Sequence, residues 1–175
     1  MNDEILFYEE QKFDQLWFKI AVNGSLIPVI AIFLFAVVQQ VILKEPFGNN
    51  PMSDSALTIV SIIAIFVSLG IIILFQVVKL IVTVTQEGIQ IKFYPIINKR
   101  IAKGKIEHFE IRKYRPIAEY GGWGIRFSFS GKGKAYNVKG DMGIQFKIQN
   151  HSPLLIGTQK PEEFFEALKK IKSLQ

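Results

Sequence analysis

The chain has 175 residues, of which 49% are hydrophobic, and its formal net charge at pH 7 is +6. It contains no cysteine, which excludes disulfide bonds, thiolate nucleophiles, iron–sulfur clusters and cysteine-based zinc sites. No charged residue lies between Ile20 and Leu43 or between Ala56 and Val78. This segregation of charge predicts a membrane protein with a polar domain rather than an evenly apolar globular protein.

Residues 1–19 combine acidic and apolar side chains ahead of the first uncharged stretch. A cleavable signal peptide would begin with a basic region and a short apolar core, whereas this segment is acidic, so we expect the first apolar stretch to be retained. Trp17 and Phe18 are aromatic residues of the kind that gather at membrane interfaces. We predict an amphipathic segment at residues 1–19, at the level of the lipid headgroups; a frayed start of the first helix is the alternative.

Two uncharged stretches are long enough to cross a bilayer as helices. An α-helix rises about 1.5 Å per residue, so a hydrocarbon core of roughly 30 Å needs about 20 residues. The sequence predicts transmembrane helices at residues 20–43 and 56–79. Residues 44–55 between them hold two prolines, a glycine and two asparagines, which indicates a short extracytoplasmic connector and an antiparallel helical hairpin.

The distribution of lysine and arginine predicts the orientation of this hairpin. Two of these residues precede the first span, one lies in the connector, and 18 follow from Lys79 onward. Cytoplasmic segments of membrane proteins carry an excess of Lys and Arg. We therefore expect a multi-pass protein of the inner (plasma) membrane with both termini in the cytoplasm.

The polar side chains inside the two predicted spans are uncharged. Ion and proton pathways usually contain ionisable side chains within the membrane, so a pump is not indicated. Small residues such as Ser61, Ser68 and Gly70 are typical of helix–helix contacts. Because two helices bury little of each other's surface, we expect a homo-oligomer or contact with another membrane protein.

From Leu80 onward the sequence consists of short β-prone runs separated by Gly and Pro about every ten residues, which is typical of antiparallel strands. Residues 81–85 and 89–94, with Gly88 at the turn, predict a hairpin. Further strands are predicted at residues 99–101, 106–114, 124–130, 135–138, 143–149 and 154–157.

The chain closes with a predicted amphipathic helix. Pro161 suits the first helical position, acidic residues follow it, and lysines gather towards the other end. Five apolar residues fall on one face at helical spacing, so this face should cover an apolar surface: Phe164, Phe165, Leu168, Ile171 and Leu174. About seven antiparallel strands and one capping helix is the arrangement of a pleckstrin-homology (PH) domain. The predicted fold class is α+β: an N-terminal transmembrane α-hairpin, then a cytoplasmic PH-like antiparallel β-barrel or sandwich at residues 80–175 with a C-terminal capping helix.

Four stretches are distinctive: Glu10-Gln-Lys-Phe13, Tyr120-Gly-Gly-Trp-Gly-Ile-Arg126, Ala135-Tyr-Asn-Val-Lys-Gly140 and Leu155-Ile-Gly-Thr-Gln-Lys-Pro161. In these stretches the chain resembles a family of uncharacterised bacterial two-helix membrane proteins with a PH-like domain. The resemblance extends over most of the chain and implies the same fold and topology. It implies no activity and assigns no ligand residues.

Basic residues exceed acidic ones in the predicted soluble domain, with 17 basic and 8 acidic side chains from Leu80 onward. Attraction to an anionic inner leaflet contributes about 1 kcal/mol per basic group near the surface. A charge that merely reflects topology and solubility is the alternative. The candidate contacts for lipid or for a partner are Lys99, Arg100, Lys103, Lys105, Lys132 and Lys134.

Three glycines, Gly121, Gly122 and Gly124, surround Trp123. Their spacing fits neither the dinucleotide-binding fingerprint nor the phosphate-binding P-loop. We predict a tight bend that leads into a strand, with Trp123 packed as a structural anchor.

The sequence shows no catalytic constellation. His108 and His151 each stand apart from the clustered His, Asp or Glu residues that a metal site or a nucleophilic triad requires. We therefore expect no enzymatic activity, no cofactor and no small-molecule substrate. No nucleic-acid recognition motif accompanies the basic charge, so we expect no nucleic-acid partner.

The leading hypothesis is a non-enzymatic, membrane-anchored PH-like module that binds a protein partner, or assembles with itself, through exposed strand edges or loops. One alternative is a module whose basic loops bind anionic lipid headgroups. Another is an accessory subunit of a transporter or an envelope complex, which would use the polar residues of the spans.

Overall fold

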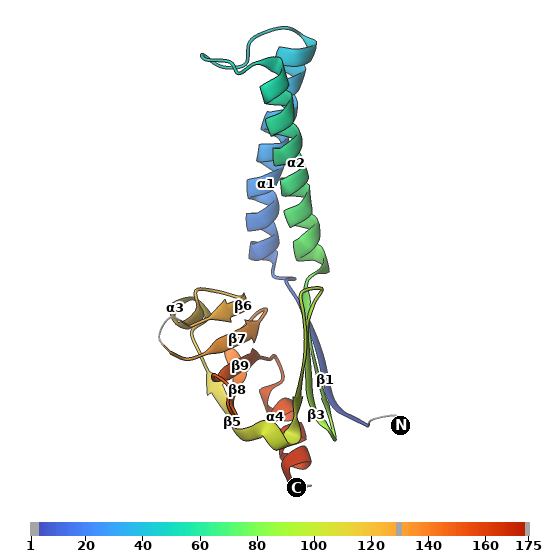
Figure 1. The fold of residues 1–175 in the computed structure, drawn as a ribbon, viewed down its shortest axis with the longest axis vertical. Helices are drawn as coiled ribbons and strands as arrows, with labels where there is room; N and C mark the ends of the chain where they lie inside the picture. Colours follow the sequence, from blue (N-terminus) through green and yellow to red (C-terminus); the bar gives the residue numbers. More distant parts are fainter. Residues whose placement is uncertain (1–3, 129–130, 174–175) are drawn as a thin grey trace. The chain divides into compact units, whose positions relative to one another are not determined.

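The computed structural model describes residues 4–128 and 131–173, and the polypeptide divides into two compact units. The helical unit comprises Asp14–Val77; the β unit comprises the N-terminal residues through Phe13 together with those from Val78 onward. The helical unit is therefore inserted between the first and second strands of the β unit (Figure 1). The β unit is built from both ends of the chain, which corrects the predicted domain boundary at residues 80–175.

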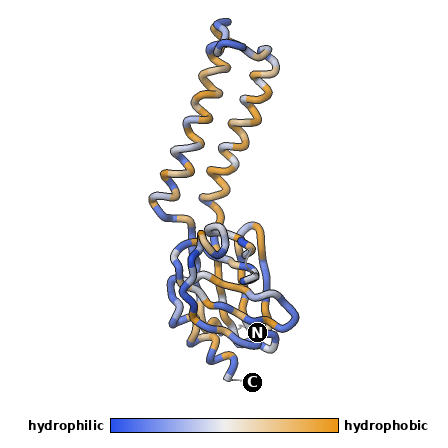
Figure 2. Tube along the Cα trace, turned by 90° about the vertical axis from the view of Figure 1, so that its left-hand side faces the viewer, coloured by the Kyte–Doolittle hydropathy of each residue, from blue (hydrophilic) through white to orange (hydrophobic). Residues whose placement is uncertain are grey.

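Two long helices make up the helical unit. α1 spans Leu16–Val37 and continues as one π-helical turn, η1, over Val38–Ile42, and α2 spans Asp54–Val77. Both helices are long and apolar enough to cross a membrane, and Figure 2 shows hydrophobic residues along most of their length. Most of the apolar side chains on these helices are exposed in the structure, whereas a core helix of a soluble domain buries them.

Small and amide side chains hold the two helices and their connector together. Ser61 and Ser68 are buried where α1 and α2 touch, as expected for small residues at a helix–helix contact, while Gly70 is exposed. Gln40, in η1, donates from Nε2 to the backbone oxygen of Met52 at 2.7 Å and to Asp54 Oδ1 at 3.0 Å. The connector is therefore fixed by a side chain that sits in the π-helical turn.

Sheet A is a four-stranded antiparallel meander. The predicted hairpin of residues 81–85 and 89–94 is confirmed, and side chains on the inner face of its strands are fully buried. The outer face is half-exposed, which gives the alternation expected of a sheet with one covered face. In order across the sheet, the strands are β1 (Ile5–Lys12), β2 (Lys79–Thr85), β3 (Gly88–Tyr94) and β4 (Ile97–Ala102).

A strand, β1, lies within residues 1–19, the segment predicted to lie at the level of the lipid headgroups. β1 pairs with β2 from Ile5 opposite Thr85 to Lys12 opposite Lys79, and α1 follows from Leu16. The inward-facing residues of β1 are Phe7, Glu9 and Gln11. Two of these three are polar, so the alternation that reveals a half-buried strand is missing from the sequence.

Sheet B has five strands and one parallel pair. β9 lies between β7 and β8, antiparallel to β8 and parallel to β7, which corrects the prediction of a wholly antiparallel fold. All four residues of β9 are buried, because this central strand is covered on both faces. In order across the sheet, the strands are β5 (Ile106–Lys113), β8 (Met142–Ile148), β9 (Leu154–Gly157), β7 (Lys134–Asn137) and β6 (Gly124–Phe127).

The C-terminal helix joins the two sheets, as its apolar face predicts. α4 spans Pro161–Ser173 and contacts β1 and β2 of sheet A and β5 and β8 of sheet B. Phe164 is fully buried and stacks on Phe7, with ring centroids 4.7 Å apart, and its centroid lies 6.0 Å from that of Phe146. The main core of the β unit is therefore a layer of side chains around this helix.

A short helix that the sequence analysis missed covers the opposite face of sheet B. α3 spans Pro116–Tyr120 and ends at Gly121, whose φ of 71° is left-handed. Tyr120 packs with Tyr114, Ala135 and Leu155 in a second, smaller buried cluster. Five residues are too few to show a helical period, which is why composition did not reveal this element.

Candidate functional site

Two of the distinctive sequence stretches meet at a buried polar contact between β1 and the segment that leads into α4. Thr158 donates from Oγ1 to Glu9 Oε2 at 2.5 Å, and the backbone N–H of Gln159 donates to Glu9 Oε1 at 2.8 Å. Gln11 donates from Nε2 to the backbone oxygen of Gly157 at 2.8 Å. We call these residues, Glu9, Gln11, Gly157, Thr158 and Gln159, the β1 clasp.

The β1 clasp buries a carboxylate and gives both of its oxygens a donor. Glu9 is 6% exposed and Gln11 is 2% exposed. A buried carboxylate is costly to desolvate unless hydrogen bonds compensate it, so Glu9 specifies the position of β1 against sheet B. The clasp therefore holds β1, the strand that precedes α1 in the chain, in the β unit.

The other two distinctive stretches meet at Asn137. Its Oδ1 accepts from the backbone N–H of Gly124 at 2.9 Å, and its Nδ2 donates to the Tyr114 hydroxyl at 3.1 Å. Burial raises the pKa of Tyr114 to about 12, so this hydroxyl is neutral at physiological pH. A Cβ at Gly157 would lie 2.8 Å from the Asn137 Cβ and 3.0 Å from the Tyr114 hydroxyl, so the approach of these strands requires glycine.

Trp123 and its glycines form a turn that is tied to the β7–β8 connection. Trp123 is half-buried, and its indole N–H donates to the backbone oxygen of Gly140 at 3.2 Å. Gly121, Gly122 and Gly124 all have positive φ, so the bend needs residues without a Cβ. The arrangement is a backbone bend that leads into β6.

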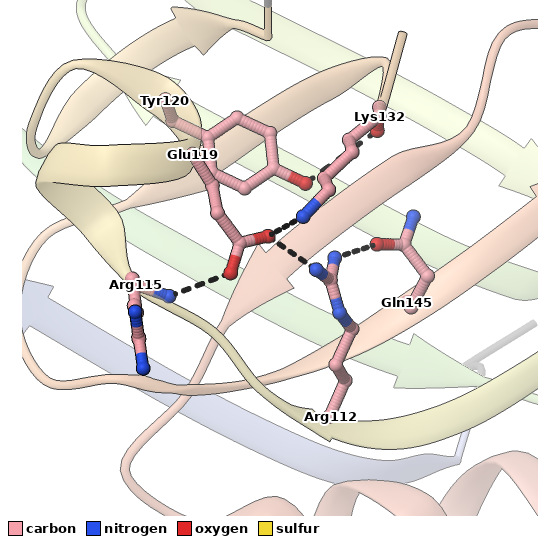
Figure 3. A network of polar contacts seen from close by, with 6 residues as sticks. All are labelled: Arg112, Arg115, Glu119, Tyr120, Lys132 and Gln145. Atoms are coloured by element: carbon pink, nitrogen blue, oxygen red, sulfur yellow. Dashed lines mark hydrogen bonds and ion pairs between the residues drawn. The ribbon is translucent and has the colours of Figure 1, made fainter. Parts of the chain in front are cut away.

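A network of ionic and polar side chains lies beside α3 (Figure 3). Glu119 is at its centre: Oε1 accepts from the Arg115 backbone N–H at 2.9 Å, and Oε2 forms ion pairs with the Arg112 guanidinium and with Lys132 Nζ, the latter at 2.9 Å. Arg112 also donates to Gln145 Oε1 at 2.9 Å. We call these residues, Arg112, Arg115, Glu119, Lys132 and Gln145, the α3 network.

The central ion pair of the α3 network is less exposed than a typical surface ion pair. The Glu119 side chain is 14% exposed and that of Arg112 is 24% exposed. Burial by itself raises the pKa of Glu119, but the hydrogen bonds and positive charges of its neighbours outweigh burial, and the pKa lies below its usual value. Glu119 is therefore ionised at neutral pH, and a network of three charges held by a backbone amide keeps its geometry better than an isolated pair.

An open hollow of about 370 Å³ lies on sheet B next to the α3 network. Its charged groups are largely paired: Lys147 contacts Glu107 at 3.0 Å, and Lys132 and Arg112 contact Glu119. Its two apolar residues are Phe146, which is fully buried, and Pro153, which is exposed. We call it the β5–β8 hollow. Its polar lining comes from His108, Glu110, Arg112, Lys132, Gln145 and Lys147.

The six basic residues singled out from the sequence occupy different places. Lys132 belongs to the α3 network. Lys99 is half-buried on the same face of β4 as the buried Ile101, whereas its neighbour Arg100 is exposed on the other face. Lys103 and Lys105 lie in a single 3₁₀ turn (Lys103–Lys105) after β4. The last of the six, Lys134, lies at the start of β7, 5.0 Å from the centre of the Phe127 ring.

Lys99 in sheet A and Lys134 in sheet B interact electrostatically. Burial, and next the positive charge of Lys134, lower the pKa of Lys99 below its usual value. Two ammonium groups that repel each other are both stabilised by an added anion.

The histidines and acidic residues are the side chains that could ligate a metal ion in the part of the chain that the structure describes. No group of three or more His, Cys, Asp or Glu side chains is placed to hold a metal ion there. His108 Nε2 lies 3.9 Å from Glu110 Oε2, and both side chains are mostly exposed. This pair lines the β5–β8 hollow and can contribute charge to a binding surface.

The residues at the centre of both polar sites, Glu9 and Glu119, escaped sequence analysis. Glu9 shares a strand face with Phe7 and Gln11, a pattern that reads as polar rather than buried. Glu119 is brought close to Arg112 and Lys132 by a helix of five residues, which is too short to be predicted from residue spacing.

The chain matches no family model, no curated protein and no solved structure.

Proposed function

We propose that this chain is a non-enzymatic, membrane-anchored PH-like module that binds a protein partner, or a second copy of itself, at the inner surface of the plasma membrane. Two helices that are long and apolar enough to cross a membrane support the anchoring. The excess of Lys and Arg from Lys79 onward supports a cytoplasmic location of both termini.

A PH-like assignment of the β unit draws support from its order of elements. A four-stranded meander, a second sheet and a C-terminal helix packed between them follow one another in the β unit. Two features are departures from a plain PH arrangement: the parallel pairing of β7 with β9, and the helical unit in place of a β1–β2 turn. The proposal therefore concerns a variant of that architecture.

The observation that carries the binding proposal is the β5–β8 hollow, an open surface of polar side chains whose charges are largely paired. Complementary charges across a protein–protein interface set the orientation of the partner. Anionic lipid would be attracted by unpaired cations, whereas Arg112, Lys132 and Lys147 already contact carboxylates. The hollow therefore fits a protein surface of mixed charge better than a lipid headgroup.

A site-specific photo-crosslinker tests this proposal in native membranes. We expect a crosslinker in place of Lys147, on the rim of the hollow, to give a defined product; its mass distinguishes a second copy from another protein. Lys170, exposed on α4, is the matched control and should give none. His108→Trp, which adds bulk at the rim, should remove the product from position 147. Recovery of monomer alone, or equal products from positions 147 and 170, would contradict the proposal.

Binding of anionic lipid headgroups is the second candidate, and the repulsion between Lys99 and Lys134, which an anion would relieve, favours it. Each basic group near an anionic surface contributes about 1 kcal/mol. If this candidate holds, anionic nanodiscs should protect both lysines of the intact chain from an amine-reactive reagent, and salt should remove the protection. Equal reactivity in zwitterionic and anionic nanodiscs would count against it.

A further inference from the structure

The turn between β3 and β4 exposes apolar side chains at one end of sheet A. β3 ends at Tyr94 and β4 begins at Ile97, and the backbone N–H of Ile96 donates to the Phe93 oxygen at 2.7 Å to close the turn. Tyr94 is 50% exposed and Ile96 is 59% exposed. Isolated exposed apolar residues are common on soluble domains, but here two of them flank an exposed proline in one turn.

The strand register places this turn at the end of sheet A from which the chain passes into the helices. Lys12, the last residue of β1, lies opposite Lys79, the first residue of β2, and Lys79 in turn lies opposite Tyr94. Neighbouring strands are about 4.8 Å apart, so Tyr94 lies about one strand spacing from Lys79. One residue separates Lys79 from Val77, the end of α2, and three separate Lys12 from the start of α1.

We propose that the β3–β4 turn inserts into the interfacial layer of the lipid bilayer, with Tyr94 and Ile96 as its lipid contacts. The inference rests on the proposed crossing of the membrane by α1 and α2, and it goes beyond the protein-binding role of the hollow. A span that ends at Val77 leaves Lys79 near the headgroup level, and Tyr94, which lies opposite Lys79 in the strand register, is about one strand spacing away from it.

The side chains around the turn have the chemistry of a membrane interface. Tyr94 has a polar hydroxyl on an aromatic ring, a combination that favours the boundary between lipid and water. Lys12 and Lys79 lie across the sheet from it and Lys92 lies two residues before it; lysines at such a boundary place their stems along apolar groups and their ammonium groups in water. Two acidic residues lie at or beyond this end: Glu10, which forms ion pairs with both Lys12 and Lys79, and Asp14, which follows β1 in the chain.

The opposite end of β4 provides an internal comparison. Ala102 is exposed and lies opposite Gly88, five residues along β4 from Ile97. At about 3.3 Å per residue, this end of the strand is roughly 17 Å from the turn. A lipid contact confined to the turn should therefore distinguish Ile96 sharply from Ala102.

Because the chain contains no cysteine, single cysteines can be introduced without a background. Ile96→Cys and Tyr94→Cys probe the turn, and Ala102→Cys is the matched control; all three positions are exposed, so the fold should tolerate them. Each full-length variant is labelled with a polarity-sensitive fluorophore and reconstituted into phosphatidylcholine liposomes with or without lipids that carry a quencher. We expect several-fold stronger quenching by lipid at positions 96 and 94 than at position 102.

Two results would overturn the inference. One is equal lipid quenching at positions 96 and 102; the other is a blue-shifted emission at position 96 that lipid-borne quenchers leave unchanged, because protein rather than lipid would then cover the turn. Alkaline extraction of the same liposomes separates this failure from a failure of membrane crossing. Retained protein with an unquenched turn refutes the lipid contact alone, whereas protein released by alkali refutes the membrane crossing and the lipid contact together.

Discussion

Replacing Phe164 with alanine is expected to lower the free energy of unfolding of the β unit by about 3–5 kcal/mol, the usual cost of truncating a buried Phe. Phe164 is fully buried, stacks on Phe7 and lies close to Phe146, so it joins β1, α4 and sheet B in one contact. Truncating Phe164 would leave a cavity between α4 and the two sheets that it joins. Urea unfolding of the detergent-solubilised chain, followed by pulse proteolysis, measures the change.

Phe165→Ala is the matched control for this prediction. Phe165 is the next residue of α4 and is half-buried, with its ring 5.3 Å from that of Phe109. Because it loses less apolar contact, its truncation should cost roughly 1 kcal/mol. Equal costs at the two positions would show that α4 does not pack on sheet B through Phe164.

Replacing Glu9 with alanine is expected to lower the free energy of unfolding by about 2–3 kcal/mol, because hydrogen bonds to a buried charged group contribute more than neutral ones. The Thr158 hydroxyl and the Gln159 backbone N–H would lose their acceptor. We also expect faster hydrogen exchange in the segment between β9 and α4. Mass spectrometry of exchanged peptides reports this local effect separately from global unfolding.

Glu10→Ala tests whether the loss of stability expected from Glu9→Ala is specific to the inner face of β1. Glu10 is the next residue of the strand and forms surface ion pairs with Lys79 at 2.9 Å and Lys12 at 3.2 Å. Exposed ion pairs contribute little to stability, so this variant should stay close to the parent protein in both measurements. A larger loss from Glu10→Ala than from Glu9→Ala would contradict the β1 clasp.

The elements that the sequence reveals are those with a strong local pattern. Uncharged length predicts α1 and α2, alternation around Gly88 predicts β2 and β3, and helical spacing of apolar residues predicts α4. In each case, one face or one whole surface is apolar over many residues. The pattern is therefore independent of which element lies opposite.

The features that escape prediction depend on partners far away in the chain. Glu9 faces the interior because its carboxylate accepts hydrogen bonds from Thr158 and Gln159, which lie 149 and 150 residues later in the chain. The parallel pairing of β7 with β9 depends on where β8 lies in the sheet, which no run of residues encodes. Likewise, the α3 network depends on an ion pair between Glu119 in α3 and Lys132, which follows β6 in the chain. The secondary-structure propensity of a short segment does not predict such long-range pairings.

The helical unit is an insertion in the chain between β1 and β2, and removing the helices tests this organisation most directly. Lys12 and Lys79 lie directly opposite each other, so an Asn-Gly turn can join residues 4–12 to residues 79–175 as a β-hairpin. We expect this soluble protein to unfold cooperatively on heating and to give a dispersed amide NMR spectrum, while residues 79–175 alone, without β1, do neither. Cooperative unfolding of residues 79–175 alone, at the same temperature as the joined protein, would contradict a domain built from both ends of the chain.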